Sequence, residues 1–126
     1  MPLARIDLLE GKSPEFRRTL ADVVYQAMVA ALKTPENDRF QVINEHKPEN
    51  FFFDPHFFNI ERQNCIFIQM TLKEGRTLAQ KSDFYKQVVD GLHDKLGHRR
   101  EDVFISLVPV GAEDWSFGNG EASLVK

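Results

Sequence analysis

The chain begins with Met1-Pro2, and this start is its most suggestive chemical feature. Methionine is commonly removed in front of a small residue, which here would leave Pro2 with a free secondary amine. An α-amino group has a pKa of about 8, so this amine could serve as an acid or a base close to neutral pH, unlike lysine. Burial lowers the pKa of an amine, whereas a nearby carboxylate raises it. We therefore take Pro2 as the candidate catalytic group.

Other chemistry-bearing residues give weaker signals. The histidines stand at positions 46, 56, 93 and 98, without HxxxH or HExxH spacing, and one cysteine cannot build a thiolate zinc site, so we expect no metal. Cys65 precedes an apolar run and is interpreted as a small buried hydrophobe. No Walker loop, dinucleotide fingerprint or GxSxG elbow is present, and Gly118-Asn119-Gly120 is interpreted as a turn.

Composition and charge narrow the class of protein. The 126 residues are 42% hydrophobic and 28% charged, which is typical of one globular domain. A net charge of −3 argues against a nucleic-acid partner, because phosphate binding needs clustered lysine and arginine. No run approaches the roughly 20 apolar residues that span a bilayer, and acidic residues interrupt the start of the chain. We expect a soluble cytoplasmic protein without a membrane partner.

A repeat with a constant offset of 64 residues runs through the sequence. Residues 8–13 align with residues 72–77 without a gap, and further matches continue through the rest of each half. These later matches include Leu32 with Leu96, Asp38 with Asp102, and Phe40 with Phe104. An offset that stays constant over this length predicts a duplicated β-α-β unit. Pro2 aligns with the internal Ile66, so only the first unit could offer an amine.

The local patterns of the two units support this interpretation. Apolar-rich stretches predict strands at 2–9, 40–43, 65–72 and 103–110. Ser13 and Thr77 are predicted helix N-caps, each followed by apolar residues at helical spacing, and Thr34-Pro35 is predicted to end the first helix. We expect an α/β (α+β) fold with a four-stranded sheet and both helices on one face. The bare opposite face predicts a closed homo-oligomer.

The domain organisation follows from the repeat. We expect a single domain over 1–126, with units at about 2–44 and 65–110, a linker at 45–64 and a tail at 111–126. The linker carries five phenylalanines, which could cover a site, wrap a neighbouring subunit or fill the core. Trp115, the one tryptophan, lies in the glycine-flanked tail and is expected to dock against the body, near the same site.

Together these features resemble the tautomerase superfamily, and within it the malonate semialdehyde decarboxylase branch. The segments that carry the resemblance are Pro2-Leu3, Asp7-Leu8, Glu10-Gly11, Asn37-Asp38-Arg39, Gln80-Lys81, Phe84-Tyr85 and Asp114-Trp115-Ser116-Phe117-Gly118. The resemblance implies a homotrimer that needs no cofactor. It also implies a catalytic role for Pro2, helped by Asp38, which would orient a water or polarise the substrate. Arg76 would hold a substrate carboxylate, and Trp115 and Phe117 would form an apolar wall.

One position departs from this pattern. The decarboxylase branch has two arginines where this chain has Glu74-Gly75-Arg76, and Glu74 would repel a carboxylate. Without the resemblance, Asp38 would be interpreted as a turn cap and Arg76 as a surface residue.

Two hypotheses about function follow. The first is an enzyme that tautomerises, or decarboxylates or hydrates, a small oxo acid. The second is a non-catalytic trimeric binding or scaffold protein that keeps the fold.

Overall fold

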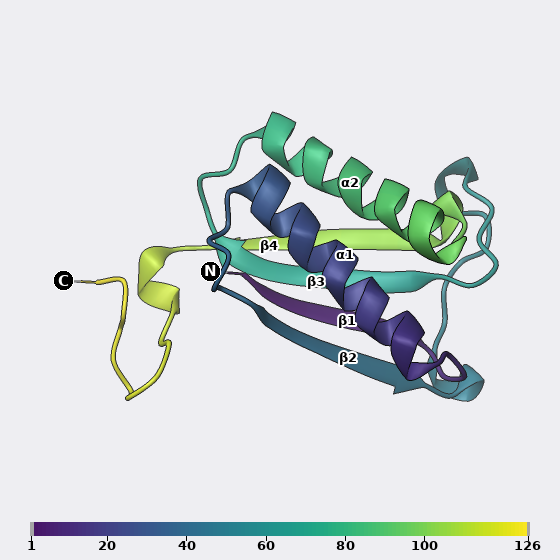
Figure 1. The fold of residues 1–126 in the computed structure, drawn as a ribbon, viewed down its shortest axis with the longest axis horizontal. Coiled ribbons are helices and arrows are strands. Elements are labelled where there is room, and N and C mark those ends of the chain that lie inside the picture. Colours follow the sequence, from purple (N-terminus) through teal and green to yellow (C-terminus); the bar gives the residue numbers. More distant parts are fainter. Residues whose placement is uncertain (1, 126) are drawn as a thin grey trace.

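The computed structural model describes residues 2–125 (Figure 1). Its strands and long helices follow the order β1 (Leu3–Leu9), α1 (Pro14–Leu32), β2 (Phe40–His46), β3 (Ile66–Lys73), α2 (Leu78–Leu96) and β4 (Val103–Val110). Four short 3-10 helices are η1 (Pro48–Asn50), η2 (Phe57–Asn59), η3 (Arg100–Asp102) and η4 (Ala112–Asp114). The two predicted β-α-β units are therefore present, separated by the linker that holds η1 and η2.

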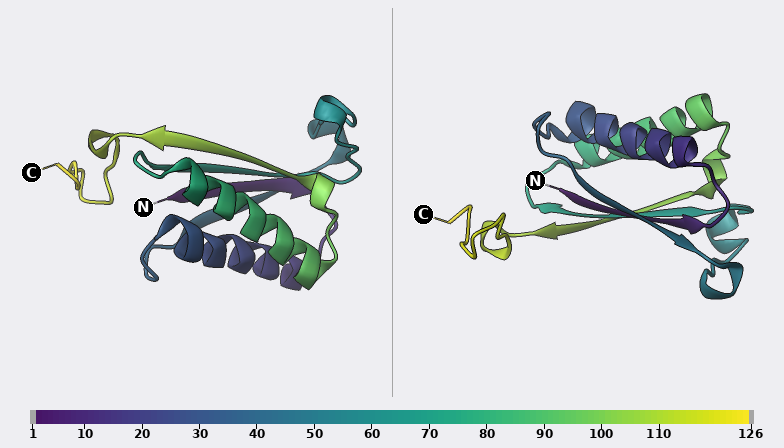
Figure 2. Two further views of the ribbon diagram at one scale, coloured as in Figure 1. Left: turned by 90° about the horizontal axis from the view of Figure 1, so that it is seen from above. Right: turned by 60° about the horizontal axis from the view of Figure 1, so that its bottom comes forward.

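The four strands form one mixed sheet in the order β2-β1-β3-β4. Within each unit the strands are parallel, and the units join through the antiparallel pair β1 and β3. Ile6 in β1 lies opposite Ile43 on one side and Ile68 on the other. Both helices cover the same face of the sheet (Figure 2). This confirms the predicted fold class.

Helix boundaries follow the capping residues. The Ser13 hydroxyl accepts a hydrogen bond from the Phe16 amide at 3.1 Å, and Thr77 forms a reciprocal capping box with Gln80. α1 ends at Leu32, before the predicted Thr34-Pro35 stop, because Lys33 already adopts a left-handed conformation. Gly97 ends α2 in the same conformation. β2 runs to His46, three residues beyond the predicted Ile43, because its pairing with β1 continues to Leu9.

The core lies between the helices and the covered face of the sheet. Its strand residues alternate along β1 and β3, as expected when one face is buried. The fully buried large side chains are Ile6, Leu8, Leu20, Val24, Met28, Leu32, Ile66, Ile68, Met70, Leu72, Phe84 and Leu92. The helices approach closely at Gly91, where an added Cβ would lie 2.7 Å from Val23 Cγ1. No helix in 2–125 has an apolar stretch that would cross a bilayer.

Neither α1 nor α2 covers the opposite face of the sheet (Figure 2). Phe40, Val42 and Phe104 stay 40–60% exposed there. The linker covers part of this face, because Phe51 packs on Phe67 with ring centroids 4.7 Å apart and stacks on His46 at 5.5 Å. This linker therefore fills space at one end of the sheet and leaves the rest of the face open.

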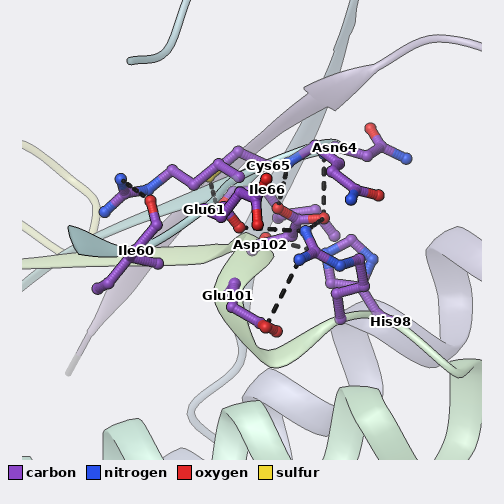
Figure 3. Close-up of polar contacts among 11 residues, drawn as sticks. Ile60, Glu61, Asn64, Cys65, Ile66, His98, Glu101 and Asp102 are labelled. Carbon is purple, nitrogen blue, oxygen red and sulfur yellow. Dashed lines mark hydrogen bonds and ion pairs between the residues drawn. The ribbon is translucent and has the colours of Figure 1, made fainter. Parts of the chain in front are cut away.

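The end of the linker is held by Asp102, a buried residue of η3 (Figure 3). Its carboxylate accepts hydrogen bonds from the backbone amides of Gln63 and Asn64, at 2.8 and 3.0 Å. Arg99 adds an ion pair at 3.2 Å. These contacts satisfy amide groups just ahead of β3 and fix the place where the second unit begins.

Changing Asp102 should therefore cost stability. We expect Asp102→Asn to lower the free energy of unfolding by about 2 kcal/mol, because an amide NH₂ group cannot accept both backbone bonds or pair with Arg99. Urea denaturation measures the change. The matched control is Asp94→Asn at an exposed helix position, which should change it by less than about 0.5 kcal/mol. Equal effects of the two substitutions would contradict a structural role for Asp102.

Candidate active site

Four segments that are distant in sequence meet at one end of the sheet. The start of β1, the loop 33–39 after α1, the turn 74–77 before α2 and the tail after β4 all lie there (Figure 1). Strand directions explain this, because β1 and β2 begin at the end where β3 and β4 finish. Loops that gather at one end of a rigid sheet are the usual carriers of binding and catalytic residues.

A pocket of about 440 Å³ opens at this end beside the buried Pro2. Its walls are mostly apolar, with a few polar residues among them. The lining residues are Pro2, Leu3, Asn37, Asp38, Phe40, Trp115, Ser116 and Phe117. Four of the five predicted site residues are therefore brought together. Asn37 and Ser116 were not singled out by sequence, although both lie inside segments that carry the family resemblance.

The tail forms the apolar wall of this pocket. Trp115 and Phe117 have ring centroids 5.7 Å apart. Two local bonds shape the tail around them: the Gly111 amide donates to Asp114 Oδ2 at 2.8 Å, and the Phe117 amide donates to Ser123 Oγ at 2.9 Å. The tail therefore places Trp115 in the wall of the Pro2 pocket.

The repeat clarifies why Asp38 lies beside Pro2. Its counterpart in the second unit, Asp102, binds the backbone amides of Gln63 and Asn64, shortly before β3. The matching place in the first unit is the head of β1, where Asp38 and Pro2 line one pocket. In the second unit, Asp102 thus binds backbone amides in the middle of the chain. In the first unit, the equivalent Asp38 lines a pocket with Pro2.

Arg76 lies elsewhere. It lines a second cavity of about 430 Å³, together with Leu32, Lys33, Pro35, Lys73, Glu74, Gly75 and Gln80. Its Nε donates to the Leu32 carbonyl at 3.3 Å and its Nη1 to the Lys73 carbonyl at 2.8 Å. The loop 33–39 contributes to both cavities, so they lie side by side on that loop. The structure does not bring Arg76 into the walls of the Pro2 pocket.

The second cavity, called the charged cavity below, is lined by two lysines that were not among the predicted site residues, Lys33 and Lys73. Lys73 lines the cavity at the end of β3, in the alternation that faces away from the core. Lys33 was not considered. The available signal was the repeat, which aligns Lys33 with Gly97 at the end of a helix.

Cys65 lies outside both cavities and is fully buried. Burial, and secondarily the negative charge of Asp102, raise the pKa of its thiol from 9.0 to about 11. The described residues also hold no group of three histidine, cysteine, aspartate or glutamate side chains arranged to bind a metal.

The raised pKa predicts that the Cys65 thiol of the folded protein reacts slowly with thiol reagents. At pH 8 its thiolate fraction is about 100-fold lower than in the unfolded chain, so we expect an aromatic disulfide reagent to react at least about 100-fold more slowly before urea is added. The folded state holds this proton more tightly, so the group's contribution to stability is complete below pH 9 and is lost as the pH rises towards 11. Fast labelling of the native protein would contradict the buried assignment.

Comparison with known proteins agrees with this architecture. Two family models described as tautomerase enzyme match residues 38–118 and 2–59. The "Probable tautomerase YusQ" of Bacillus subtilis (strain 168) is 40% identical over the full length of both chains. A solved malonate semialdehyde decarboxylase is 30% identical, with a TM-score of 0.89 over 97% of this chain and 95% of that one. A fused 4-OT protein is 18% identical, with a TM-score of 0.79 over 94% of each chain, and shares the fold. The chain therefore belongs to the tautomerase family of enzymes.

Proposed function

We propose that this protein is a cofactor-free enzyme that uses the Pro2 amine, freed by removal of Met1, as a general acid or base on a small oxo acid. The observation that carries the proposal is the shared pocket, which Asp38 and the buried Pro2 line together with apolar residues. Apolar surroundings strengthen the electrostatic interaction of these two groups. Trp115 and Phe117 would exclude water from the reacting atoms.

Two reaction modes use the same residues. In the tautomerase mode, neutral Pro2 takes a proton from the enol oxygen or the carbon beside the carbonyl, and its ammonium returns one at the other position. In the decarboxylase or hydratase mode, protonated Pro2 polarises the carbonyl while Asp38 orients a water. General acid-base catalysis of this kind contributes roughly 10²–10⁴-fold. Arg76 would hold the substrate carboxylate from the neighbouring cavity, where a guanidinium suits a bidentate contact.

The open sheet face supports a homotrimer as the working state. It leaves Phe40, Val42 and Phe104 exposed, which is unfavourable for a monomer of this size. The fused 4-OT protein that shares the fold is described as a symmetric trimer. We include trimer formation in the proposal, and sedimentation equilibrium of the purified protein tests it.

The deciding experiment joins intact mass to an enzyme assay. The mass shows whether Met1 is removed, and ketonisation of enol-phenylpyruvate shows whether the pocket moves protons. Ketonisation that requires the free Pro2 amine supports the proposal. A protein without Met1 that neither ketonises this enol nor decarboxylates or hydrates malonate semialdehyde contradicts it. That outcome favours the non-catalytic scaffold, for which Glu74 in place of an arginine is the relevant observation.

A further inference from the structure

We propose that Lys33 provides the second positive charge of the substrate-carboxylate site, beside Arg76. This inference rests on the proposed function and deepens it. Glu74 occupies the place of the first arginine in the decarboxylase pattern, so a carboxylate held by Arg76 needs another cation. The charged cavity contains three cations, Arg76, Lys33 and Lys73, and one acid, Glu74. These four residues carry a net charge of +2, which attracts an anionic group such as a carboxylate.

Arg76 and Lys33 are joined through the backbone. The Nε of Arg76 donates to the carbonyl of Leu32, the residue directly before Lys33, at 3.3 Å. A second bond from Nη1 to the Lys73 carbonyl fixes the guanidinium between the end of α1 and the end of β3. The Lys33 ammonium has one long contact, 3.5 Å to the Ala30 carbonyl, so it can turn towards a ligand at little cost.

The backbone of Lys33 supplies independent support. It has φ 59° and ψ 34°, a left-handed conformation that is unfavourable for a residue with a Cβ. The equivalent residue of the second unit is Gly97, with φ 63° and ψ 21°, which adopts this conformation without penalty. The unit that contains Pro2 thus has a lysine at a left-handed position where the other unit has a glycine. Backbone strain of this type concentrates at functional sites.

Lys33 is better placed than Lys73 for this role. Lys73 continues the alternation of Phe67, Gln69 and Thr71 along β3, which belongs to the helix-free face. Lys33 ends α1 and begins the loop that continues to Asn37 and Asp38 in the Pro2 pocket. The charged cavity and the Pro2 pocket therefore share the loop 33–39.

The test measures binding of an inert carboxylate, phenylacetate, and of its neutral analogue phenylacetamide by NMR titration. We expect Lys33→Gly to weaken phenylacetate binding about fivefold to tenfold and to leave phenylacetamide unchanged, because one charge-assisted contact is lost. The same substitution relieves the left-handed strain, so its unfolding midpoint should stay level or rise by up to about 4 °C. Lys33→Arg should retain binding, and the matched control Lys95→Ala, at an exposed position in the last turn of α2, should change neither value.

The outcomes separate this inference from the proposed function. Binding of phenylacetate needs no proton transfer, so it remains measurable even if the protein ketonises no enol. Equal phenylacetate affinity in wild type and Lys33→Gly would overturn the role of Lys33, as would a wild type that does not bind phenylacetate at millimolar concentrations. Equal weakening by Lys95→Ala would reduce the effect to general surface charge and would also overturn it.

Discussion

We expect a Pro2→Leu variant to lose about 10²–10⁴-fold in kcat/KM for ketonisation of enol-phenylpyruvate, if the Pro2 amine acts as proposed. Leucine is too large for efficient removal of the preceding methionine, so the nitrogen of residue 2 stays an amide and cannot carry a catalytic proton. The pocket itself is kept apolar, because leucine replaces proline among walls formed by Leu3, Phe40, Trp115 and Phe117. The variant also retains Met1, so its rate has to be compared with that of a variant that loses Met1 and keeps an amine.

Pro2→Ala is the matched control for this experiment. Alanine permits removal of Met1 and so keeps an amine, now primary, at the same place. We expect an intermediate rate, below wild type because the proline ring no longer fixes the nitrogen against the wall of the pocket. Intact mass of all three proteins shows which of them carry Met1. Equal kcat/KM in wild type, Pro2→Ala and Pro2→Leu would contradict the amine mechanism for this reaction.

The fold was largely predictable because the β-α-β unit is repeated in the sequence. The 64-residue offset, two capping hydroxyls at Ser13 and Thr77, and apolar residues at strand and helix spacing define the element order. Pairing of the units through β1 and β3 has no local signature, since antiparallel contacts between distant strands depend on tertiary packing. The contacts of Asp102 with Gln63 and Asn64 also join residues far apart in sequence and leave no pattern to detect.

The candidate site was predicted unevenly for a physical reason. Pro2 was named from the chain start and Trp115 from its glycine-flanked tail, whereas Asp38 and Phe117 came from the family resemblance. Chain topology brings all four to one pocket. Arg76 came from the same resemblance, but its guanidinium is bonded to two backbone carbonyls in the neighbouring cavity. A long side chain next to a turn can point to either of two cavities, and that choice depends on acceptors from other elements.

Asp38→Asn is expected to reduce kcat/KM for ketonisation and to move the pH profile. Asparagine has nearly the same shape as aspartate but carries no charge, so the pocket keeps its form while the negative potential beside Pro2 disappears. A carboxylate favours the protonated amine, so its removal lowers the pKa of the Pro2 amine. The limb of the kcat/KM profile that follows this amine moves to lower pH by the same amount.

The direction of that movement separates the two reaction modes. If Pro2 acts as a base, the acidic limb shifts down and the variant keeps activity at pH values where the wild type has lost it. If protonated Pro2 is the active form, the basic limb shifts down and activity near neutral pH falls.

Asp102→Asn is the matched control, because it makes the same substitution at the equivalent position of the second unit, remote from the amine. It should lower stability and leave the profile in place. An unshifted profile in Asp38→Asn would mean that its carboxylate does not act on the Pro2 amine, and the pairing of these two residues would then have to be abandoned.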